Sequence, residues 1–334
     1  MDSDFKTFCA ALGADTEAIQ GAGGNISVKE GNTLHIKASG MWLREATKKN
    51  IFISVPLREI LRRHNAHAES LADLTNAAGL RPSIETGLHA LIPQRYVVHT
   101  HCVDTLAHSV HHNAKENLHK ALANFCHALV PPARPGLPLA LAVEQALSCE
   151  PKATVFILMN HGLVIAGETL EETRQTLNAV KNALTVPIRQ PLPPATDLSM
   201  RNDLNWYAPE NEYIQTIATD TTSLRLIQEA PLYPDHVVFL GPQIPVAAHD
   251  ASLSSALDMF ELKIGYRPAW MLFPEKGVLV SPRCGSSELA MLEALGRVAQ
   301  RLTPSFAPLR TLSADIVLSL TQWEAERYRK QLNA

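Results

Sequence analysis

The sequence predicts a protein of the α/β class with two domains. Stretches with strand character alternate with helical patterns along most of the chain, which is typical of α/β layering. The length of 334 residues suits two domains, at about 150 residues for each. The segment Pro187–Asp203 contains four prolines and resists regular structure. We therefore expect one domain at residues 1–195 and a smaller α/β region at residues 204–334.

The elements expected before this segment follow from caps, turns and apolar patterns. Ser3 suits an N-cap, so a helix is expected over Asp4–Leu12, with Gly13 ending it. A glycine-dense turn at Gly21–Ser27 enters a strand, and Asn160-His161-Gly162 forms a turn between two strands within Thr154–Ile165. Further strands are expected at Thr33–Ala38, Ile51–Val55 and Tyr96–Thr100, and further helices at Arg58–His67, from Pro82 onward, at His108–His127 and at Glu168–Leu184.

The region after the prolines contains fewer clear patterns. We expect strands at His236–Leu240 and within Ala269–Val280, and helices at Ser286–Leu302 and Ser313–Leu332. The run Ala269–Val298 resembles Thr154–Leu184, because both read strand, turn, strand, loop and helix, and Lys276 stands where His161 would be. We interpret this as the ordinary likeness of two αβ units. A degenerate repeat that lost a ligand is the alternative.

The composition excludes several classes of function. Apolar residues make up 46% of the chain and charged residues 19%, and the formal net charge is −3. Such a balance gives no electrostatic footprint for nucleic acid or an anionic membrane, and no apolar stretch approaches the roughly 20 residues that span a bilayer. The five cysteines are scattered without a CxxC pair, and no signal-type apolar core follows the acidic start. We expect a cytoplasmic protein with reduced thiols.

Three histidines have the arrangement of a catalytic metal site. His99 and His101 flank Thr100 on an expected strand, where alternate side chains share a face. His161 lies in a tight turn before Gly162, which permits close approach. Three neutral imidazoles leave one position of a tetrahedral metal open, and an open position can bind and polarise a substrate carbonyl.

Glu85 is the candidate base for this site. It lies in the first turn of the helix expected from Pro82, shortly before the histidine pair. A carboxylate beside a metal can transfer protons when burial and the cation tune its pKa. Each of these features also occurs without function, since most HxH pairs are incidental and an acidic residue near a helix start stabilises the helix dipole alone. Their combination and order favour a site.

The same residues carry a resemblance to the class II aldolase/adducin family. The resemblance spans about Gly21 to Leu184 and rests on motifs in the family's order: Gly24-Asn25-Ile26-Ser27, Ala38-Ser39-Gly40, Pro82-Ser83-Ile84-Glu85, Val98-His99-Thr100-His101 and Asn160-His161-Gly162-Leu163. Beyond them, Tyr233–Gly241 and Trp323-Glu324-Ala325-Glu326 resemble the aldolase part of a predicted rhamnulose-phosphate aldolase/short-chain dehydrogenase fusion family. No GxGxxG follows, so we expect no dehydrogenase half in this chain.

The resemblance implies a fold, a cofactor and a set of roles. It implies αβα layers around a central, mostly antiparallel sheet, and Zn²⁺ or another divalent first-row metal on His99, His101 and His161. It assigns the base to Glu85. It also implies a closed homo-oligomer, a tetramer with sites between subunits. Its phosphate pocket maps onto Asn25, Ser27, Ser39, Gly40 and Ser83.

The sequence departs from the family pattern in two places. Ile84 replaces a second serine of the fuculose-phosphate type, which removes a hydroxyl donor and favours a carboxylate or an unphosphorylated end over a phosphate. Lys37 shares a strand face with Ser39 and is the nearby cation, although a solvent-facing lysine is the commoner case. Pro131-Pro132 stands where relatives often have Pro-Tyr, and the family's tyrosine proton donor has no counterpart that we can place.

Together these observations predict a zinc-dependent lyase of the aldolase type. It would make or break a carbon–carbon bond next to the carbonyl of a sugar, sugar phosphate or sugar acid. An epimerase, decarboxylase or dehydratase on the same metal site is an alternative. A non-catalytic, adducin-like interaction module is the alternative from another class, although such a module does not need the histidines and Glu85.

Overall fold

A mixed sheet of seven strands forms the centre of the N-terminal part of the protein. The computed structural model describes residues 1–189, 198–229, 231–303 and 308–332. Neighbouring strands run in the order β3-β2-β1-β4-β7-β6-β5. All adjacent pairs are antiparallel except β5 and β6, so the mostly antiparallel sheet is confirmed. The strands are β1 (Asn25–Glu30), β2 (Thr33–Lys37), β3 (Phe52–Pro56), β4 (Tyr96–Thr100), β5 (His127–Val130), β6 (Val155–Leu158) and β7 (Gly162–Gly167).

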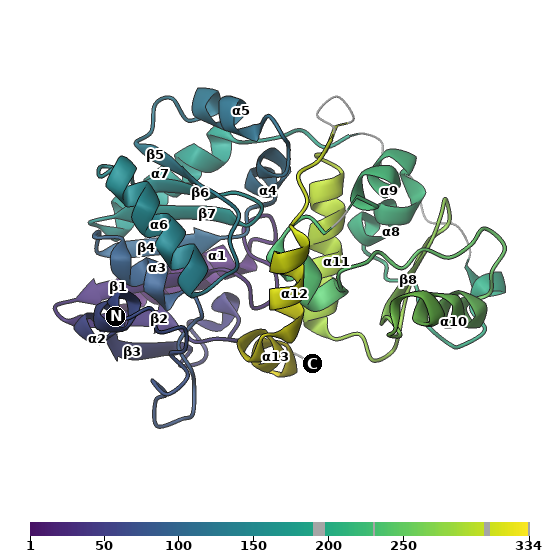
Figure 1. The fold of residues 1–334 in the computed structure, drawn as a ribbon, viewed down its shortest axis with the longest axis horizontal. Helices are drawn as coiled ribbons and strands as arrows, with labels where there is room; N and C mark the ends of the chain where they lie inside the picture. Colours follow the sequence, from purple (N-terminus) through teal and green to yellow (C-terminus); the bar gives the residue numbers. More distant parts are fainter. Residues whose placement is uncertain (190–197, 230, 304–307, 333–334) are drawn as a thin grey trace.

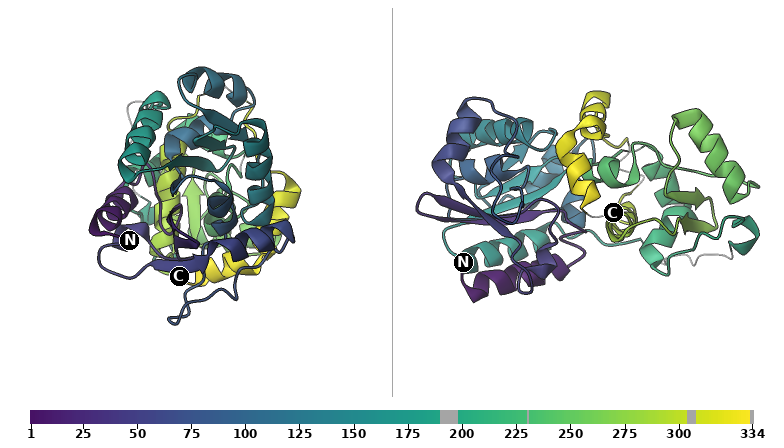
Figure 2. Two further views of the ribbon diagram at one scale, coloured as in Figure 1. Left: turned by 90° about the vertical axis from the view of Figure 1, so that its left-hand side faces the viewer. Right: turned by 90° about the horizontal axis from the view of Figure 1, so that it is seen from below.

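Helices cover both faces of this sheet, which confirms the αβα layers (Figure 2). Helices α1 (Ser3–Ala14) and α7 (Leu170–Ala183) pack on one face and share a core with Ile26 and Val98. The opposite face packs against α2 (Leu57–Asn65), α3 (Thr86–Leu91) and α6 (Leu137–Cys149). Helices α4 (Val103–Ser109) and α5 (Ala114–Ala121) follow β4.

Local chemistry accounts for the ends of several helices. The side chain of Asp2 accepts a hydrogen bond from the backbone N–H of Phe5 at 2.8 Å, so the N-cap of α1 is Asp2 and the prediction of Ser3 was wrong. Both are short oxygen-bearing side chains, and one residue's shift is a common error at a helix end. Thr169 caps α7 in the same way, with Oγ1 3.1 Å from the N–H of Glu172.

The C-terminal part is mainly helical and lies beside the sheet (Figure 1). Its elements are α8 (Glu212–Thr219), α9 (Thr221–Ile227), α10 (Leu253–Ile264), the hairpin β8 (Trp270–Phe273) and β9 (Gly277–Val280), α11 (Ser286–Ala299), α12 (Ala314–Gln322) and α13 (Glu324–Gln331). Trp270, Leu272, Val278 and Leu292 belong to its main core. The hairpin confirms the strands expected within Ala269–Val280, and α11 confirms the helix expected from Ser286.

Several predicted elements differ from the structure. His236–Leu240, predicted as a strand, is a π-helical turn that ends at Gly241. A short apolar run does not distinguish a buried strand from a buried helical turn. The helix expected over Ser313–Leu332 is interrupted at Trp323, whose backbone is extended. The helix expected over His108–His127 is not continuous: α4 ends at Ser109, α5 covers Ala114–Ala121, and His127 begins β5.

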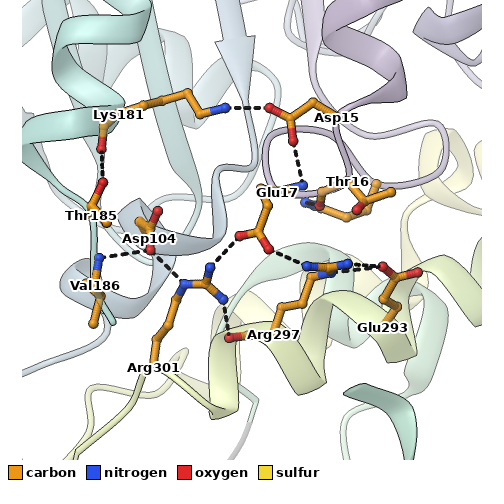
Figure 3. Close-up of polar contacts among 11 residues, drawn as sticks. Asp15, Thr16, Glu17, Asp104, Lys181, Thr185, Val186, Glu293, Arg297 and Arg301 are labelled. Atoms are coloured by element: carbon orange, nitrogen blue, oxygen red, sulfur yellow. Dashed lines mark hydrogen bonds and ion pairs between the residues drawn. The ribbon is translucent and has the colours of Figure 1, made fainter. Parts of the chain in front are cut away.

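Ion pairs and a shared core join the two parts of the chain. Arg301, just after α11, pairs with Asp104 of α4 at 2.7 Å and with Glu17 at 2.5 Å, and Arg297 also pairs with Glu17 (Figure 3). Val103 and Leu106 of α4 pack in one apolar cluster with Tyr233, Val298 and Leu302. The C-terminal part is therefore fixed against the end of β4, where two of the three histidines lie.

The division of the chain at residues 195 and 204 remains a prediction. Of the expected linker Pro187–Asp203, residues 190–197 lie outside the described residues. Every helix in the described part of the chain is too short or too polar to cross a membrane.

Candidate metal centre

The three predicted histidines come together at one end of the sheet. His99 is in β4, His101 follows that strand, and His161 lies in the turn between β6 and β7. Their rings are 4.9 to 5.2 Å apart between centroids. One nitrogen from each ring lies within 4.8 Å of the others, and all three side chains are buried. This group can hold a metal ion.

Hydrogen bonds orient two of the rings toward a common centre. Nδ1 of His99 lies 3.1 Å from the carbonyl oxygen of Leu163, and Nδ1 of His101 lies 2.9 Å from Oδ2 of Asp235. Both partners are acceptors, so each Nδ1 donates its proton, and the Nε2 of a neutral ring then presents its lone pair. The two Nε2 atoms face one another at 3.1 Å. Two lone pairs at that distance fit a bound cation.

The protonation states of the site also suit metal binding. Burial, opposed by Glu85, lowers the pKa of His99 to about 3, so this imidazole is neutral at neutral pH. Neutral imidazole and ionised carboxylate are the forms that coordinate metals. Burial works to raise the pKa of Glu85, but His99, His161 and His101 outweigh burial and hold it well below its ordinary value.

Glu85 lies against the histidines from the start of α3. It is the residue before the helix and not part of the first turn, which corrects the predicted helix start. Oε2 of Glu85 accepts a hydrogen bond from Nδ2 of Asn25 at 2.6 Å. Oε1 lies 3.2 Å from Nε2 of His161 and 3.5 Å from Nε2 of His99. This buried oxygen has no hydrogen-bond partner among the described residues, an unfavourable state that a cation between the rings would relieve.

Four of the five residues predicted to hold the substrate line a small cavity beside the histidines. Asn25, Ser39, Gly40 and Ser83 are in its wall, together with Glu85, His101 and His161, and its volume is about 20 Å³. Asn25 also donates to Oγ of Ser83 at 3.1 Å. The fifth residue, Ser27, lies outside this wall. Its hydroxyl is 2.8 Å from Nδ1 of His89, and both side chains are fully buried.

Lys37 faces the same cavity from β2 and is buried, so it is not the solvent-facing lysine of the alternative. Its Nζ donates to the carbonyl oxygens of Ala22 at 2.9 Å and Met41 at 2.7 Å. Burial, together with Arg329, lowers its pKa to about 7, against the effect of Glu85 and Asp235. The lysine therefore ties two loops of the cavity wall together.

Sequence reasoning missed the residues that the C-terminal part contributes. Asp235 and Arg329 also line the cavity. Arg329 donates to both carboxylate oxygens of Asp235, at 2.6 and 2.9 Å. Burial works to raise the pKa of Asp235, but Arg329 and His101 hold it well below its ordinary value. An ionised Asp235 thus links the guanidinium to a metal-site histidine.

Glu326 completes this buried set of charges. Its Oε2 lies 3.4 Å from Nη1 of Arg329, and its Oε1 has no hydrogen-bond partner within the described part of the chain. Burial raises its pKa to about 7, with Arg329 opposing and Asp235 and Glu85 adding to the rise. The segments that resembled the fusion family, Tyr233–Gly241 and Trp323–Glu326, contain Asp235 and Glu326, and they were the available signal.

Gly23 lets the chain pass close to the contact between the two parts. A Cβ at this position would lie 2.8 Å from Nδ1 of His101 and 3.1 Å from Oδ2 of Asp235. Any side chain here would push the carboxylate away from the imidazole. The glycine-dense segment before β1 therefore serves the histidine–aspartate contact.

Comparison with protein families matches the N-terminal part. Residues 7–187 fit the model of the family described as "Class II Aldolase and Adducin N-terminal domain". A relative from Bacillus subtilis (strain 168), named "Uncharacterized oxidoreductase YuxG", is 29% identical over 190 residues, which are 52% of this chain and 27% of that protein. The matched part is about a quarter of that relative. A match to part of a longer oxidoreductase agrees with the resemblance to the aldolase part of a fusion.

Solved structures of similar fold include two aldolase-type proteins. The N-terminal class II aldolase domain of a conserved protein from Thermoplasma acidophilum is 25% identical, with a TM-score of 0.47, covering 55% of this chain and 93% of that chain. The L-fuculose-1-phosphate aldolase from Thermus thermophilus is 17% identical, with a TM-score of 0.39, covering 55% of this chain and 93% of that chain.

Proposed function

The chain belongs to the class II aldolase and adducin N-terminal domain family, and we propose that it is a zinc-dependent lyase of the aldolase type. It would act on a small hydroxy-carbonyl compound, such as a sugar, a sugar acid or a sugar phosphate. The single observation that supports this proposal most is the placement of Oε1 of Glu85 against the buried histidine group. A carboxylate and three imidazoles in one enclosed site suit proton transfer beside a polarised carbonyl.

His99, His101 and His161 would hold the metal in this proposal. A bound zinc ion, or another divalent first-row metal, supplies an electrophile that polarises the substrate carbonyl. The chain's own residues fix the direction of the ligand nitrogens, because the carbonyl of Leu163 and the carboxylate of Asp235 hold Nδ1 of His99 and of His101. Asp235 acts through His101 and is therefore a positioning residue.

Glu85 would move the proton. In the direction of synthesis, it would remove a proton from the carbon next to the carbonyl, the electron pair left there would attack the carbonyl carbon of an aldehyde, and the aldehyde oxygen would take a proton from water to become the hydroxyl. In the direction of cleavage, that hydroxyl would give its proton to water as the carbon–carbon bond breaks, and the protonated Glu85 would return its proton to the carbon. The amide of Asn25, 2.6 Å from Oε2, keeps the carboxylate in position through both directions.

The remaining wall residues would bind the polar end of the substrate. Asn25, Ser39, Gly40 and Ser83 offer short polar side chains and backbone N–H groups at the cavity. We propose in addition a homotetramer and a cytoplasmic location. All five cysteines lie in the described part of the chain and none of them is in a disulfide, which agrees with a reducing compartment.

A substrate screen tests the proposed function. Purified protein, with its metal content measured, is offered sugar phosphates, sugar acids and free sugars, and products are identified by NMR. Two fragments from one substrate support the aldolase. One rearranged product indicates an epimerase, release of CO₂ a decarboxylase, and loss of water a dehydratase. A metal-loaded protein that turns over none of these compounds would argue for a non-catalytic module.

A further inference from the structure

A second cavity lies between α13 and the loop that precedes α3, next to the metal-site cavity. We propose that this outer cavity binds an uncharged arm of the substrate that has an apolar or aromatic face. The inference rests on the proposed function, because it assumes that the reacting end of the same molecule is at the histidine group. The C-terminal part, which supplies one wall of this cavity, would then help to determine which substrate binds.

The sizes of the two cavities give most of a substrate more room in the outer one. The cavity beside the histidines has a volume of about 20 Å³, little more than the space for one water molecule. The outer cavity has a volume of about 240 Å³. Ser39, Ser83 and Ile84 are in the walls of both. A molecule whose carbonyl end enters the inner cavity can therefore extend past these three residues into the outer one.

Two aromatic residues of the C-terminal part form one wall of the outer cavity. They are Trp323, at the break between α12 and α13, and Tyr328. Arg134 lies over the Trp323 ring, 4.2 Å from its centroid, and Arg81 lies over the Tyr328 ring at 4.1 Å. The cations hold the rings in place from the side of the N-terminal part.

The backbone near Trp323 is shaped to accept the indole. A Cβ at Gly136 would lie 2.8 Å from a carbon of the Trp323 ring, and the φ angle of Gly136 is +91°. A larger residue at Gly136 would therefore clash with the ring in a strained backbone conformation. The aromatic wall is a fixed surface, against which the flat face of a ligand packs well.

The charges of the outer cavity disfavour an anionic arm. Its charged wall residues are two carboxylates, Glu69 and Glu324, and one guanidinium, Arg81. Arg81 pairs with Glu324 at 3.0 Å, and Glu69 pairs with Arg134 at 2.5 Å. A phosphate would meet the excess of carboxylates and compete for cations that are already paired. Leu71, Ala72, Pro82, Ile84 and Ala325 supply the apolar remainder of the wall.

Three hydroxamic acids with the same metal-chelating head test the proposal. Acetohydroxamate has no arm, benzohydroxamate adds an uncharged aromatic arm, and 4-carboxybenzohydroxamate puts a charge on that arm. Binding to the zinc-loaded full chain is measured by calorimetry. We expect benzohydroxamate to bind about tenfold tighter than acetohydroxamate, the effect of burying much of a phenyl ring. We expect the carboxylate to cancel that gain.

Variants on opposite walls locate the arm. Tyr328→Ala and the cavity-filling Ala72→Trp should each remove the tenfold gain and leave the binding of acetohydroxamate unchanged. Tyr328→Phe keeps the ring and should keep the gain. Arg327→Ala changes an exposed side chain of the same helix and should also keep the gain, with circular dichroism confirming that every variant is folded.

The outcomes separate this inference from the proposed function. Equal binding of acetohydroxamate and benzohydroxamate, or tightest binding of the charged compound, would overturn the outer-cavity proposal while the metal site stands. A chain that takes up no metal would overturn the proposed function. In that case saturation-transfer NMR still tests the cavity, because the ring protons of benzohydroxamate should receive signal from the parent and not from Tyr328→Ala. Signal of equal strength from both would overturn the outer-cavity proposal as well.

Discussion

Two hairpins of this chain have the same backbone turn and different surroundings. In the first, β6 and β7 flank Asn160 and His161, with φ of 58° at Asn160 and 159° at Gly162. In the second, β8 and β9 flank Glu275 and Lys276, with φ of 63° at Glu275 and 147° at Gly277. A helix follows each hairpin, α7 and α11. The resemblance seen in the sequence therefore extends to the geometry of the turn.

The surroundings of the two turns are what differ. Asn160 is fully buried, and its amide donates to the carbonyl oxygens of Leu232 at 2.9 Å and Arg310 at 2.7 Å. These bonds fix the His161 turn against the C-terminal part. In the second turn, by contrast, Glu275 is exposed. A turn places a side chain, but a site forms only where other elements converge on it. The predictions below separate what each part of the chain contributes.

The largest effect is expected from removing a ligand supplied by the N-terminal part. His101→Ala should reduce the metal content from about one ion per chain to nearly none, because a three-histidine site has no spare ligand. The fold should persist, since the surrounding sheet and helices have their own cores. Metal analysis after dialysis and circular dichroism measure both. His249→Ala, at an exposed position, is the control, and full metal content in His101→Ala would exclude this ligand.

The next effect concerns the proton-transfer group from the same part. Glu85→Gln keeps the shape of the side chain and the hydrogen-bonding position of Asn25, but it removes the base. We expect turnover of a substrate found in the screen to fall by about 10² to 10⁴, with metal content unchanged. Glu171→Gln, on the exposed side of α7, should behave like the parent. Equal activity of Glu85→Gln and parent would assign the proton transfer to another group.

The sequence predicted that the three histidines and Glu85 of the N-terminal part lie together, because short motifs encode their spacing. The spacing of His99 and His101 on one strand, and the tight turn at His161, are local features that fix side-chain directions. The αβα layers and the mostly antiparallel sheet were predicted through the family resemblance, which rests on the same motifs.

The C-terminal contribution could not be predicted in the same way. Asp235 reaches His101, and Arg329 reaches Asp235, across elements that are far apart in the chain. No local pattern encodes such a contact. The strand predicted at His236–Leu240 also gave the wrong position for Asp235. A strand would place the residues around Asp235 differently from the π-helical turn that the chain forms.

Glu326 provides a pH test of the C-terminal contribution. Its pKa is about 7 in the folded protein, above its ordinary value of 4.5. The stability that this raised pKa provides is fully present below pH 4.5 and is lost as pH rises through 7. The free energy of unfolding falls by about 3 kcal/mol as a result. Arg329, Asp235 and Glu85 are the charged groups that influence it.

Glu326→Gln should remove that loss. We expect the free energy of unfolding of the variant, relative to the parent, to increase by about 3 kcal/mol between pH 4.5 and pH 8. Urea unfolding at several pH values measures it. Glu324→Gln, an exposed neighbour on α13, should run parallel to the parent. Parallel curves for Glu326→Gln and the parent would mean that Glu326 does not titrate in this range.

A smaller effect is expected where the C-terminal part orients His101, one of the three metal-site histidines. Asp235→Asn keeps the size of the side chain but weakens its hold on Nδ1 of His101. We expect metal affinity to fall by about 10- to 100-fold, measured by competition with a chelator. Asp258→Asn, on the exposed side of α10, is the control. Unfolding measurements on both variants separate lost affinity from lost stability, since Asp235 also pairs with the buried Arg329. Unchanged affinity would restrict Asp235 to a structural role.

The smallest effect is expected at Ile84, where the inner and outer cavities meet. Its side chain offers no hydrogen-bond donor at a point that the substrate would pass under the outer-cavity proposal. A serine here would add one donor, and a phosphate oxygen would gain more from it than an uncharged end, because hydrogen bonds to charged groups are the stronger ones. Ile84→Ser should therefore shift the ratio of kcat/KM for the phosphorylated over the unphosphorylated form of one active substrate by about tenfold toward the phosphorylated form.

Ile84→Val keeps an apolar side chain of similar shape and should leave the ratio unchanged, so a shift in both variants would indicate a packing effect. If the parent already prefers the phosphorylated form strongly, and Ile84→Ser weakens that preference, then the anion binds elsewhere, with Lys37 and Arg329 as the nearest cations in the cavity wall.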